Sequence, residues 1–263
     1  LGAAGTLSIT NCNVENKGGY TALYSGGEMT LTGGSITAEA ERNAIMSKSA
    51  MTITNATVKA TAQKYNALRA SDVMKIDKGR VEATTFGEET YAIHMEPMDD
   101  GNNGRMEIGG GVELYVNGYN GISVGEGATI EDARIVIDSE ACSIDMPVKF
   151  ADGYDIARAL GGDSKENAKP FDWYSMSLEP YTPNQPGTFP YLELLSGAKH
   201  TLRVTNGTIS EMNGKQYTGN EAEIPAGSPV TLTLTVNEDA FTAGDVFSSW
   251  TLSPTPRDLR IDG

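Results

Sequence analysis

An internal repeat of about 22 residues constrains the fold of this chain more than any other feature. Four stretches align closely: LSITNCNV (7–14), MTLTGGSI (29–36), MTITNATV (51–58) and MKIDKGRV (74–81). Two looser copies begin at Met106 and Ala128, so the six starts lie 22, 22, 23, 32 and 22 residues apart. A second landmark follows each start: Ala22-Leu23, Ala44-Ile45, Ala67-Leu68, Ala92-Ile93, Gly121-Ile122 and Ser143-Ile144. Two landmarks in phase over six copies indicate a solenoid, in which each repeat buries its apolar side only by stacking on its neighbours.

Each repeat is predicted to form three short strands. Apolar residues alternate with Ser, Thr, Lys or Glu at the start of a copy, which is strand periodicity. The fifth position of most copies holds a residue type that tolerates a left-handed backbone and can bend the chain: Asn11, Gly33, Asn55, Gly110 and Asp132, with Lys78 as the exception. A Val or Ile then begins the second strand, and the Ala-Ile/Leu landmark marks the third. We therefore predict that Ile9, Leu31, Ile53 and Ile76 stack in one column.

Residues 1–150 resemble the right-handed parallel β-helix of the pectate-lyase-like fold. The register of a leucine-rich repeat and the six-residue rhythm of a left-handed helix are both absent. The resemblance implies an all-β fold with about six coils. The repeat stops after Met146, and residues 151–198 are predicted to form an irregular C-terminal cap with a Pro-rich segment. Within this cap, residues 154–160 are predicted to be a short helical turn.

Residues 199–263 are predicted to form a small, β-rich module. The runs at 200–205 and 230–236 alternate apolar and polar residues, and Asn206-Gly207 is a hairpin signal. This order resembles the B-repeat of internalin-type bacterial surface proteins. The matching residues are Val204, Asn206, Gly207, Ala226, Gly227, Val230, Thr231, Thr233, Phe247 and Trp250. The resemblance implies a β-grasp-like stalk or spacer in which Trp250 is a core residue.

The first repeat is predicted to be open on its outer side. Leu1 precedes Leu7 by six residues, the spacing that separates most landmarks from the next start, so the chain begins on a third strand. An open solenoid end presents unpaired strand edges. We expect this N-terminal coil to pack on residues lost by cloning or processing, or on another chain.

Composition excludes several classes of function. The formal net charge is −15, which repels phosphate backbones and argues against nucleic-acid binding. The apolar runs are only a few residues long, so we expect no membrane insertion. With His94 and His200 as the only histidines, neither a zinc site nor a histidine-based triad is expected, and we expect no cofactor.

The two cysteines are predicted to be free thiols. Cys12 and Cys142 fall in the first and sixth repeats. Strands stacked at ~4.8 Å would hold them ~24 Å apart, whereas a disulfide needs Cα atoms within ~7 Å. Cys12 shares its column with small residues, so it is predicted to be a small buried residue.

The fourth repeat carries two insertions that flank its third strand. Its two landmarks lie 19 residues apart, against 16 or 17 elsewhere, and 13 residues separate Ile93 from Met106 where six is usual. Insertions in repeat proteins often mark a binding face. The residue after each landmark should point outward, which makes neighbours of Arg69 and His94. Around them we expect Glu88 and Glu89 on one loop, and Glu96, Asp99 and Asp100 on the other.

This surface could be catalytic, could bind a ligand, or could be an inert acidic loop. A polysaccharide lyase needs a cation to neutralise the sugar carboxylate and a base near the acidic proton. A glycosidase needs two carboxylates at a set separation. Asp99, Asp100 and Asn103 also resemble half of a calcium loop, but Gly101 breaks the ligand spacing and a turn is favoured.

The sequence favours a secreted or cell-surface bacterial protein with a non-catalytic role. That role is adhesion, glycan binding or the spacing of other modules, and the expected partner is a glycan or another host or cell-surface ligand. The location is implied by the resemblance to surface proteins. The alternative is a polysaccharide-active enzyme, a lyase or glycosidase that acts from the fourth coil.

Overall fold

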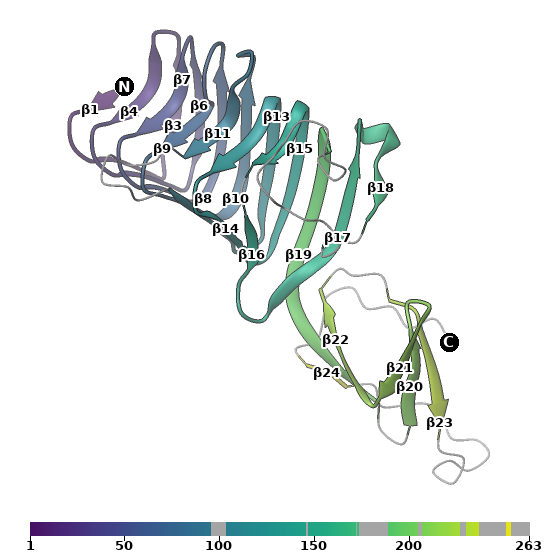
Figure 1. The fold of residues 1–263 in the computed structure, drawn as a ribbon. Helices are drawn as coiled ribbons and strands as arrows, with labels where there is room; N and C mark the ends of the chain where they lie inside the picture. Colours follow the sequence, from purple (N-terminus) through teal and green to yellow (C-terminus); the bar gives the residue numbers. More distant parts are fainter. Residues whose placement is uncertain are drawn as a thin grey trace.

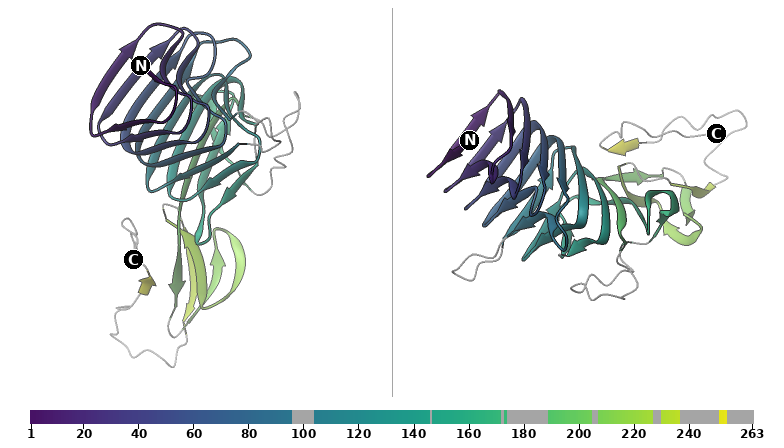
Figure 2. Two further views of the ribbon diagram at one scale, coloured as in Figure 1. Left: turned by 90° about the vertical axis from the view of Figure 1, so that its left-hand side faces the viewer. Right: turned by 90° about the horizontal axis from the view of Figure 1, so that it is seen from above.

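The protein is nearly all β and contains a parallel β-solenoid of about six turns, as the sequence predicts. A computed structural model describes residues 1–95, 104–145, 147–171, 173, 189–204, 207–226, 230–236 and 251–253. The coils stack along one axis, with the N-terminus at one end and a small β module beyond the other (Figures 1 and 2). Among the described residues, no helix has the length and apolar character needed to span a membrane.

Each coil consists of two or three strands, because the long strands continue through a bend, between the first and second sides in the third and fourth coils and between the second and third sides in the fifth and sixth. The first two coils contain β2 (Leu7–Thr10), β3 (Asn13–Lys17), β4 (Thr21–Ser25), β5 (Met29–Thr32), β6 (Ser35–Ala40) and β7 (Asn43–Ser47). The third and fourth contain β8 (Met51–Ala62), β9 (Leu68–Ala70), β10 (Val73–Thr85) and β11 (Tyr91–Met95). The fifth and sixth contain β12 (Arg105–Gly109), β13 (Val112–Val124), β14 (Gly127–Ile130) and β15 (Ala133–Asp145), with β1 (Gly2–Ala3) and β16 (Val148–Phe150) at the two ends.

Three apolar columns run through the solenoid, and the predicted register is confirmed. On the first side, Ile9 pairs with Leu31, and the column continues through Ile53, Ile76, Ile108 and Ile130. The second side stacks Val14, Ile36, Val58, Val81, Leu114 and Ile135. The third side stacks Leu23, Ile45, Leu68, Ile93, Ile122 and Ile144. These side chains form one core, in which a coil is stable only through its neighbours.

The bends between the first and second sides use a left-handed backbone at four of the five positions for which it was predicted, whereas Asp132 does not have a positive φ and the prediction is wrong there. The φ angles are 52° at Asn11, 64° at Gly33, 51° at Asn55 and 67° at Gly110. Lys78, whose residue type is rare in this region, adopts a φ of 63°. The turn therefore follows from its place in the repeat even where the residue type does not favour it.

The C-terminal end of the solenoid is closed by antiparallel strands. The cap contains β17 (Tyr154–Gly162), the 3₁₀ helix η1 (Lys165–Asn167), β18 (Lys169–Pro170) and β19 (Tyr191–Arg203). β19 pairs antiparallel with both β15 and β17, so the last edge of the second side is covered. This pairing satisfies the backbone groups that an open solenoid would expose.

The prediction of a helical turn over residues 154–160 is wrong, because these residues lie in strand β17. The segment is rich in Ala and Leu, which favour helix in isolation. Pairing with β19 overrides this local preference, as tertiary context commonly does.

The C-terminal module is β-rich. It contains the end of β19, then β20 (Gly207–Met212), β21 (Lys215–Gly219), β22 (Glu221–Pro225), β23 (Leu232–Val236) and β24 (Thr251–Ser253). β19 pairs there with β22 and β24, whereas β20 pairs with β21 and β23, so the strands on either side of Asn206-Gly207 belong to different sheets. The tight hairpin lies at Asn213-Gly214, where φ angles of 52° and 77° fit a type I′ turn.

Both cysteines are free thiols, as predicted, but the predicted burial of Cys12 is wrong. Cys12 is exposed and Cys142 is buried. The first coil has a neighbour on one side only, so its positions are less covered than the equivalent positions of the inner coils. Burial raises the pKa of the Cys142 thiol to about 11.

The stacked columns predict the cost of a core truncation. Ile76→Ala removes a fully buried side chain that lies between Ile53 and Ile108, and it should lower the free energy of unfolding by about 2–5 kcal/mol. Urea denaturation followed by circular dichroism measures the change. Lys75→Ala, at an exposed position of the same strand, serves as the control and should have an effect within about 0.5 kcal/mol.

The two thiols should differ in reactivity. At pH 8 an aromatic disulfide reagent should modify Cys12 in the folded protein, whereas Cys142 should react only after unfolding because it is buried and its pKa is high. Absorbance of the released thiolate counts the modified residues. Rapid labelling of both thiols in the folded protein would contradict the coil packing around Cys142.

Candidate functional site

The structure brings Arg69 and His94 together on the outer face of the third side. They are direct neighbours in the pairing of β9 with β11, and both side chains are half-buried. The His94 ring stacks on Tyr91, with 6.0 Å between centroids and an interplanar angle of 16°. The Tyr91 hydroxyl donates a hydrogen bond of 2.8 Å to Oδ2 of Asp145. The predicted adjacency of Arg69 and His94 is therefore confirmed, and their column continues through Ser123 to Asp145, whereas Tyr91 lies in a neighbouring row.

The acidic residues predicted around this pair are only partly described. Glu88 and Glu89 are exposed and lie in the turn before β11, where Glu89 has a φ of 55°. Glu96, Asp99 and Asp100, together with Asn103 of the possible calcium loop, lie outside the described residues. Within the described part of the chain, no group of three His, Cys, Asp or Glu side chains could hold a metal ion. A site around Arg69 and His94 thus stays a prediction.

A groove on the outer face of the second side brings together more charged and polar side chains than the described part of the surface around Arg69 and His94. It has a volume of about 330 Å³ and lies over β10, β13 and β15. Its lining residues are Arg80, Glu82, Thr84, Tyr115, Val116, Asn117, Arg134, Val136, Asp138, Lys165 and Tyr191. We call it the Tyr115 groove. The strand register forms its floor, because Glu82, Tyr115 and Val136 pair in one row and Thr84, Asn117 and Asp138 in the next.

Tyr115 lies between two arginines. The Arg80 guanidinium carbon is 4.1 Å from the centroid of the Tyr115 ring, and that of Arg134 is 5.8 Å away. Nη1 of Arg134 also donates a hydrogen bond of 2.9 Å to the Tyr115 hydroxyl. Such cation–π contacts limit the freedom of the long arginine side chains. The groove is therefore preorganised around one aromatic ring.

The positive charges of the groove are balanced by carboxylates. Arg80 contacts Glu82 at 2.8 Å and Glu113 at 2.9 Å. The hydrogen bond with Glu82 raises the pKa of the Arg80 guanidinium, a group that is charged at physiological pH in any case. Planar donors and acceptors thus lie side by side on the surface without a large net positive field.

Glu193 of β19 positions Arg134 from the cap side. Its side chain is only 8% exposed, and its Oε1 contacts Arg134 at 3.2 Å and Arg158 at 2.8 Å. The Tyr191 hydroxyl donates to Oε2 of the same carboxylate at 3.3 Å. A nearly buried carboxylate needs such partners to offset its lost hydration. The cap therefore stabilises one wall of the groove.

The Tyr115 groove continues into a second cavity of about 270 Å³. The two share Asn117 and Asp138. The other residues that line the second cavity are Thr85, Phe86, Gly87, Glu88, Gly118, Tyr119, Ser139 and Glu140. The hollowed surface thus runs along the strands to the turn between the second and third sides.

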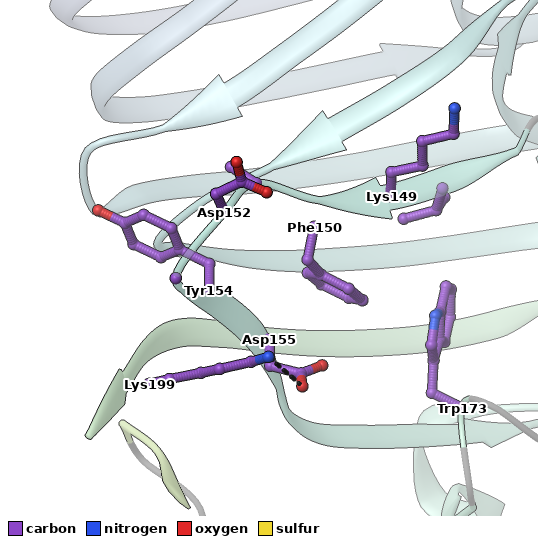
Figure 3. Close-up of a pocket in the computed structure, with 10 residues that line it drawn as sticks. Lys149, Phe150, Asp152, Tyr154, Asp155, Trp173 and Lys199 are labelled. Carbon is purple, nitrogen blue, oxygen red and sulfur yellow. Dashed lines mark ion pairs between the residues drawn. The ribbon is translucent and has the colours of Figure 1, made fainter. Parts of the chain in front are cut away.

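A cavity of about 580 Å³ lies where the last coil meets the cap (Figure 3). Trp173 is buried and packs edge-on to Phe150, with 6.3 Å between the ring centroids. Nζ of Lys199 pairs with Oδ2 of Asp155 at 3.5 Å, and Lys149 points away from this pair (Figure 3). Because its aromatic rings seal the end of the core, we assign this cavity a structural role.

Sequence reasoning missed the Tyr115 groove, although a signal for it exists. Arg80, Glu113 and Arg134 each directly precede the apolar residue of the second column, and Tyr115 directly follows one. The outward positions of the second side align these residues in the same way as those of the third side align Arg69 and His94. The contribution of Glu193 could not be read in this way, because β19 does not belong to the repeat.

The fold and these surfaces define a parallel β-solenoid with an external, polar groove that contains an aromatic ring. A family model described as "Carbohydrate-binding domain-containing protein" matches residues 2–170. The match covers more than half of the chain, so the protein belongs to this family. No curated protein and no solved structure matches it.

Removing the charge of Glu193 tests its role in the groove. Glu193→Gln keeps the size of the side chain but loses the ion pairs with Arg134 and Arg158, so the free energy of unfolding should fall by about 1.5–3 kcal/mol. Glu113→Gln, at a carboxylate with 48% exposure, is the matched control and should change it by at most about 0.5 kcal/mol. Urea denaturation of both variants provides the comparison. Equal losses of unfolding free energy in the two variants would show that Glu193 contributes no more to stability than an exposed carboxylate.

Proposed function

We propose that this protein binds glycans without chemical turnover and that the Tyr115 groove is its binding surface. The observation that carries the proposal is the arrangement of Tyr115, Arg80 and Arg134 beside carboxylates and Asn117. Membership of the carbohydrate-binding family fits such a role and supports it. The matched region contains all of the groove residues except Tyr191.

Sugar chemistry explains why this arrangement suits a glycan. A pyranose has rims of hydroxyl groups, each both donor and acceptor, and apolar C–H faces. Arginine, carboxylate and amide groups are planar and can engage two neighbouring hydroxyls at once. Tyr115 and Val136 offer apolar surface for the C–H faces. The ion pairs with Glu82, Glu113 and Glu193 hold the arginines in place before the ligand arrives, which lowers the entropic cost of binding.

The same surface favours a ligand without strong negative charge. Arg80 and Arg134 already have carboxylate partners, and the whole chain carries a net charge of −15. A strongly anionic chain would be repelled at long range, while a neutral sugar would not. Binding should therefore depend weakly on salt concentration.

An extracellular, surface-exposed setting is part of this proposal. The resemblance of the C-terminal module to an internalin-type B-repeat supports it, with Val204 buried in the core of the module. Asn206, Gly227, Phe247 and Trp250 of that resemblance lie outside the described residues. In this setting the module would act as a spacer that holds the solenoid away from the cell, and the solenoid would act as the adhesive part.

The enzymatic alternative places a lyase or glycosidase on the third side, around Arg69 and His94. The stack of His94 on Tyr91 supports this alternative, since it fixes the orientation of the half-buried imidazole on the outer face of the third side. A base of this kind would have to act beside the Tyr115 groove, not within it. Turnover lost in His94→Ala or Arg69→Ala would support the enzyme.

Glycan-array screening followed by calorimetry tests the proposal. Wild-type protein should bind at least one glycan, and Tyr115→Ala should weaken that binding about tenfold or more through loss of stacking surface and arginine order, about 1.4 kcal/mol. Thr129→Ala, at an exposed position on the first side, should bind as the wild type does. Assays for new reducing ends and unsaturated products should stay negative. Absence of binding on a broad array, or turnover at the groove, would contradict the proposal.

A further inference from the structure

Exposed aromatic rings concentrate at one corner of the solenoid. The most exposed rings in the described chain belong to Tyr20 at 67%, Phe86 at 64% and Tyr65 at 40%. All three lie in the turn between the second and third sides, in the first, fourth and third coils respectively. Single exposed apolar residues are ordinary, but a group on one line usually marks an interaction surface.

An arginine links two of these rings. Arg42 occupies the same turn in the second coil, and its backbone N–H donates to the carbonyl oxygen of Tyr20 at 3.1 Å. Its guanidinium carbon lies 5.4 Å from the centroid of the Tyr20 ring and 4.6 Å from that of Tyr65. Three consecutive coils therefore present tyrosine, arginine and tyrosine as one layered unit, which we call the aromatic corner together with Phe86 and Tyr119.

The aromatic corner is continuous with the Tyr115 groove. Phe86 and Tyr119, from the fourth and fifth coils, line the cavity of about 270 Å³. This cavity shares Asn117 and Asp138 with the groove. Each of the first five coils thus contributes one ring or guanidinium to a line that ends at the groove.

The charges along the corner are largely neutralised. Nζ of Lys64 pairs with Oε1 of Glu41 at 2.6 Å, and this hydrogen bond raises the pKa of Lys64 and lowers that of Glu41. Arg42 is the cation between the rings, while Glu88 lies near the other end. The surface combines stacking area with little net charge, which suits a neutral chain better than an anionic one.

We propose that the aromatic corner binds the continuation of a glycan chain whose end or middle occupies the Tyr115 groove. The ligand class is then an extended, largely neutral polysaccharide that runs along the solenoid axis. Coils repeat at ~4.8 Å, so Tyr20 and Tyr65 lie ~10 Å apart along the axis. The advance of ~4.8 Å for one coil is close to the length of one pyranose unit in an extended chain. Successive sugars of the chain can therefore contact successive coils. The inference rests on the proposed function and specifies its substrate.

A series of ligand lengths tests the corner separately from the groove. The probes are oligosaccharides of increasing length from the best glycan of the array, and the parent polymer. Because a second contact on the same chain acts at a high effective concentration, the Kd should fall about tenfold or more between the shortest binder and the longest. The double variant Tyr20→Ala/Tyr65→Ala should abolish this gain, so that the shortest and the longest ligands bind with about the same Kd. The double variant Tyr20→Phe/Tyr65→Phe retains the rings and should keep the gain.

The outcomes separate the two proposals. Short ligands that bind with no gain on lengthening would overturn the corner and leave the groove intact. A gain that persists in the alanine double variant would also overturn the corner. No binding of any glycan by the wild type would overturn both proposals. Sedimentation velocity provides the remaining control, since a dimer that dissociates in the alanine variant would identify the corner as a contact between two copies of the chain.

Discussion

Parallel pairing between successive coils, with three apolar columns inside, is the constraint on which every other feature depends. Once Ile53 lies on Leu31 and under Ile76, the outward residues of those strands are also placed in rows. The groove and the face of Arg69 and His94 are such rows. A mutation that disturbed the stacking would therefore displace both surfaces together. Both surfaces are held in place because they form the outside of the packed core.

The C-terminal end of the solenoid shows how a stack of coils is closed. At the C-terminal end, β19 covers β15 in an antiparallel pairing and then continues into the small β module. Phe150, Phe171 and Trp173 fill the space beyond the last coil. The same strand carries Glu193, which holds Arg134 at the groove. One element, β19, thus both closes the solenoid and holds one wall of the Tyr115 groove.

The outer surface carries arginines whose positive charges are balanced by neighbouring carboxylates. Arginines would gain little from exposed carboxylates alone, since surface ion pairs are worth about 0–1 kcal/mol. Here Arg80, Arg134 and Arg42 also lie on tyrosine rings, and ion pairs with carboxylates hold Arg80 and Arg134 in addition. The result is an array of planar donors and acceptors with apolar surface between them. This combination, more than net charge, suits ligands that carry many hydroxyl groups.

The repeat by itself determined the coil boundaries, the three columns, the bends and the adjacency of Arg69 and His94, because a fixed period makes neighbours of equivalent positions. The same period contained the rows of Arg80, Glu113 and Arg134. Tertiary structure alone decided what lies outside the period. Residues 154–160 form a strand because β19 offers an edge, and Cys12 is exposed because its coil has one neighbour. Glu193 contacts Arg134 because β19 pairs with β15, and the repeat does not predict this pairing. Contacts between coils join equivalent positions of the repeat, so they can be predicted from the spacing. Contacts between the cap and the last coil join segments that share no sequence pattern.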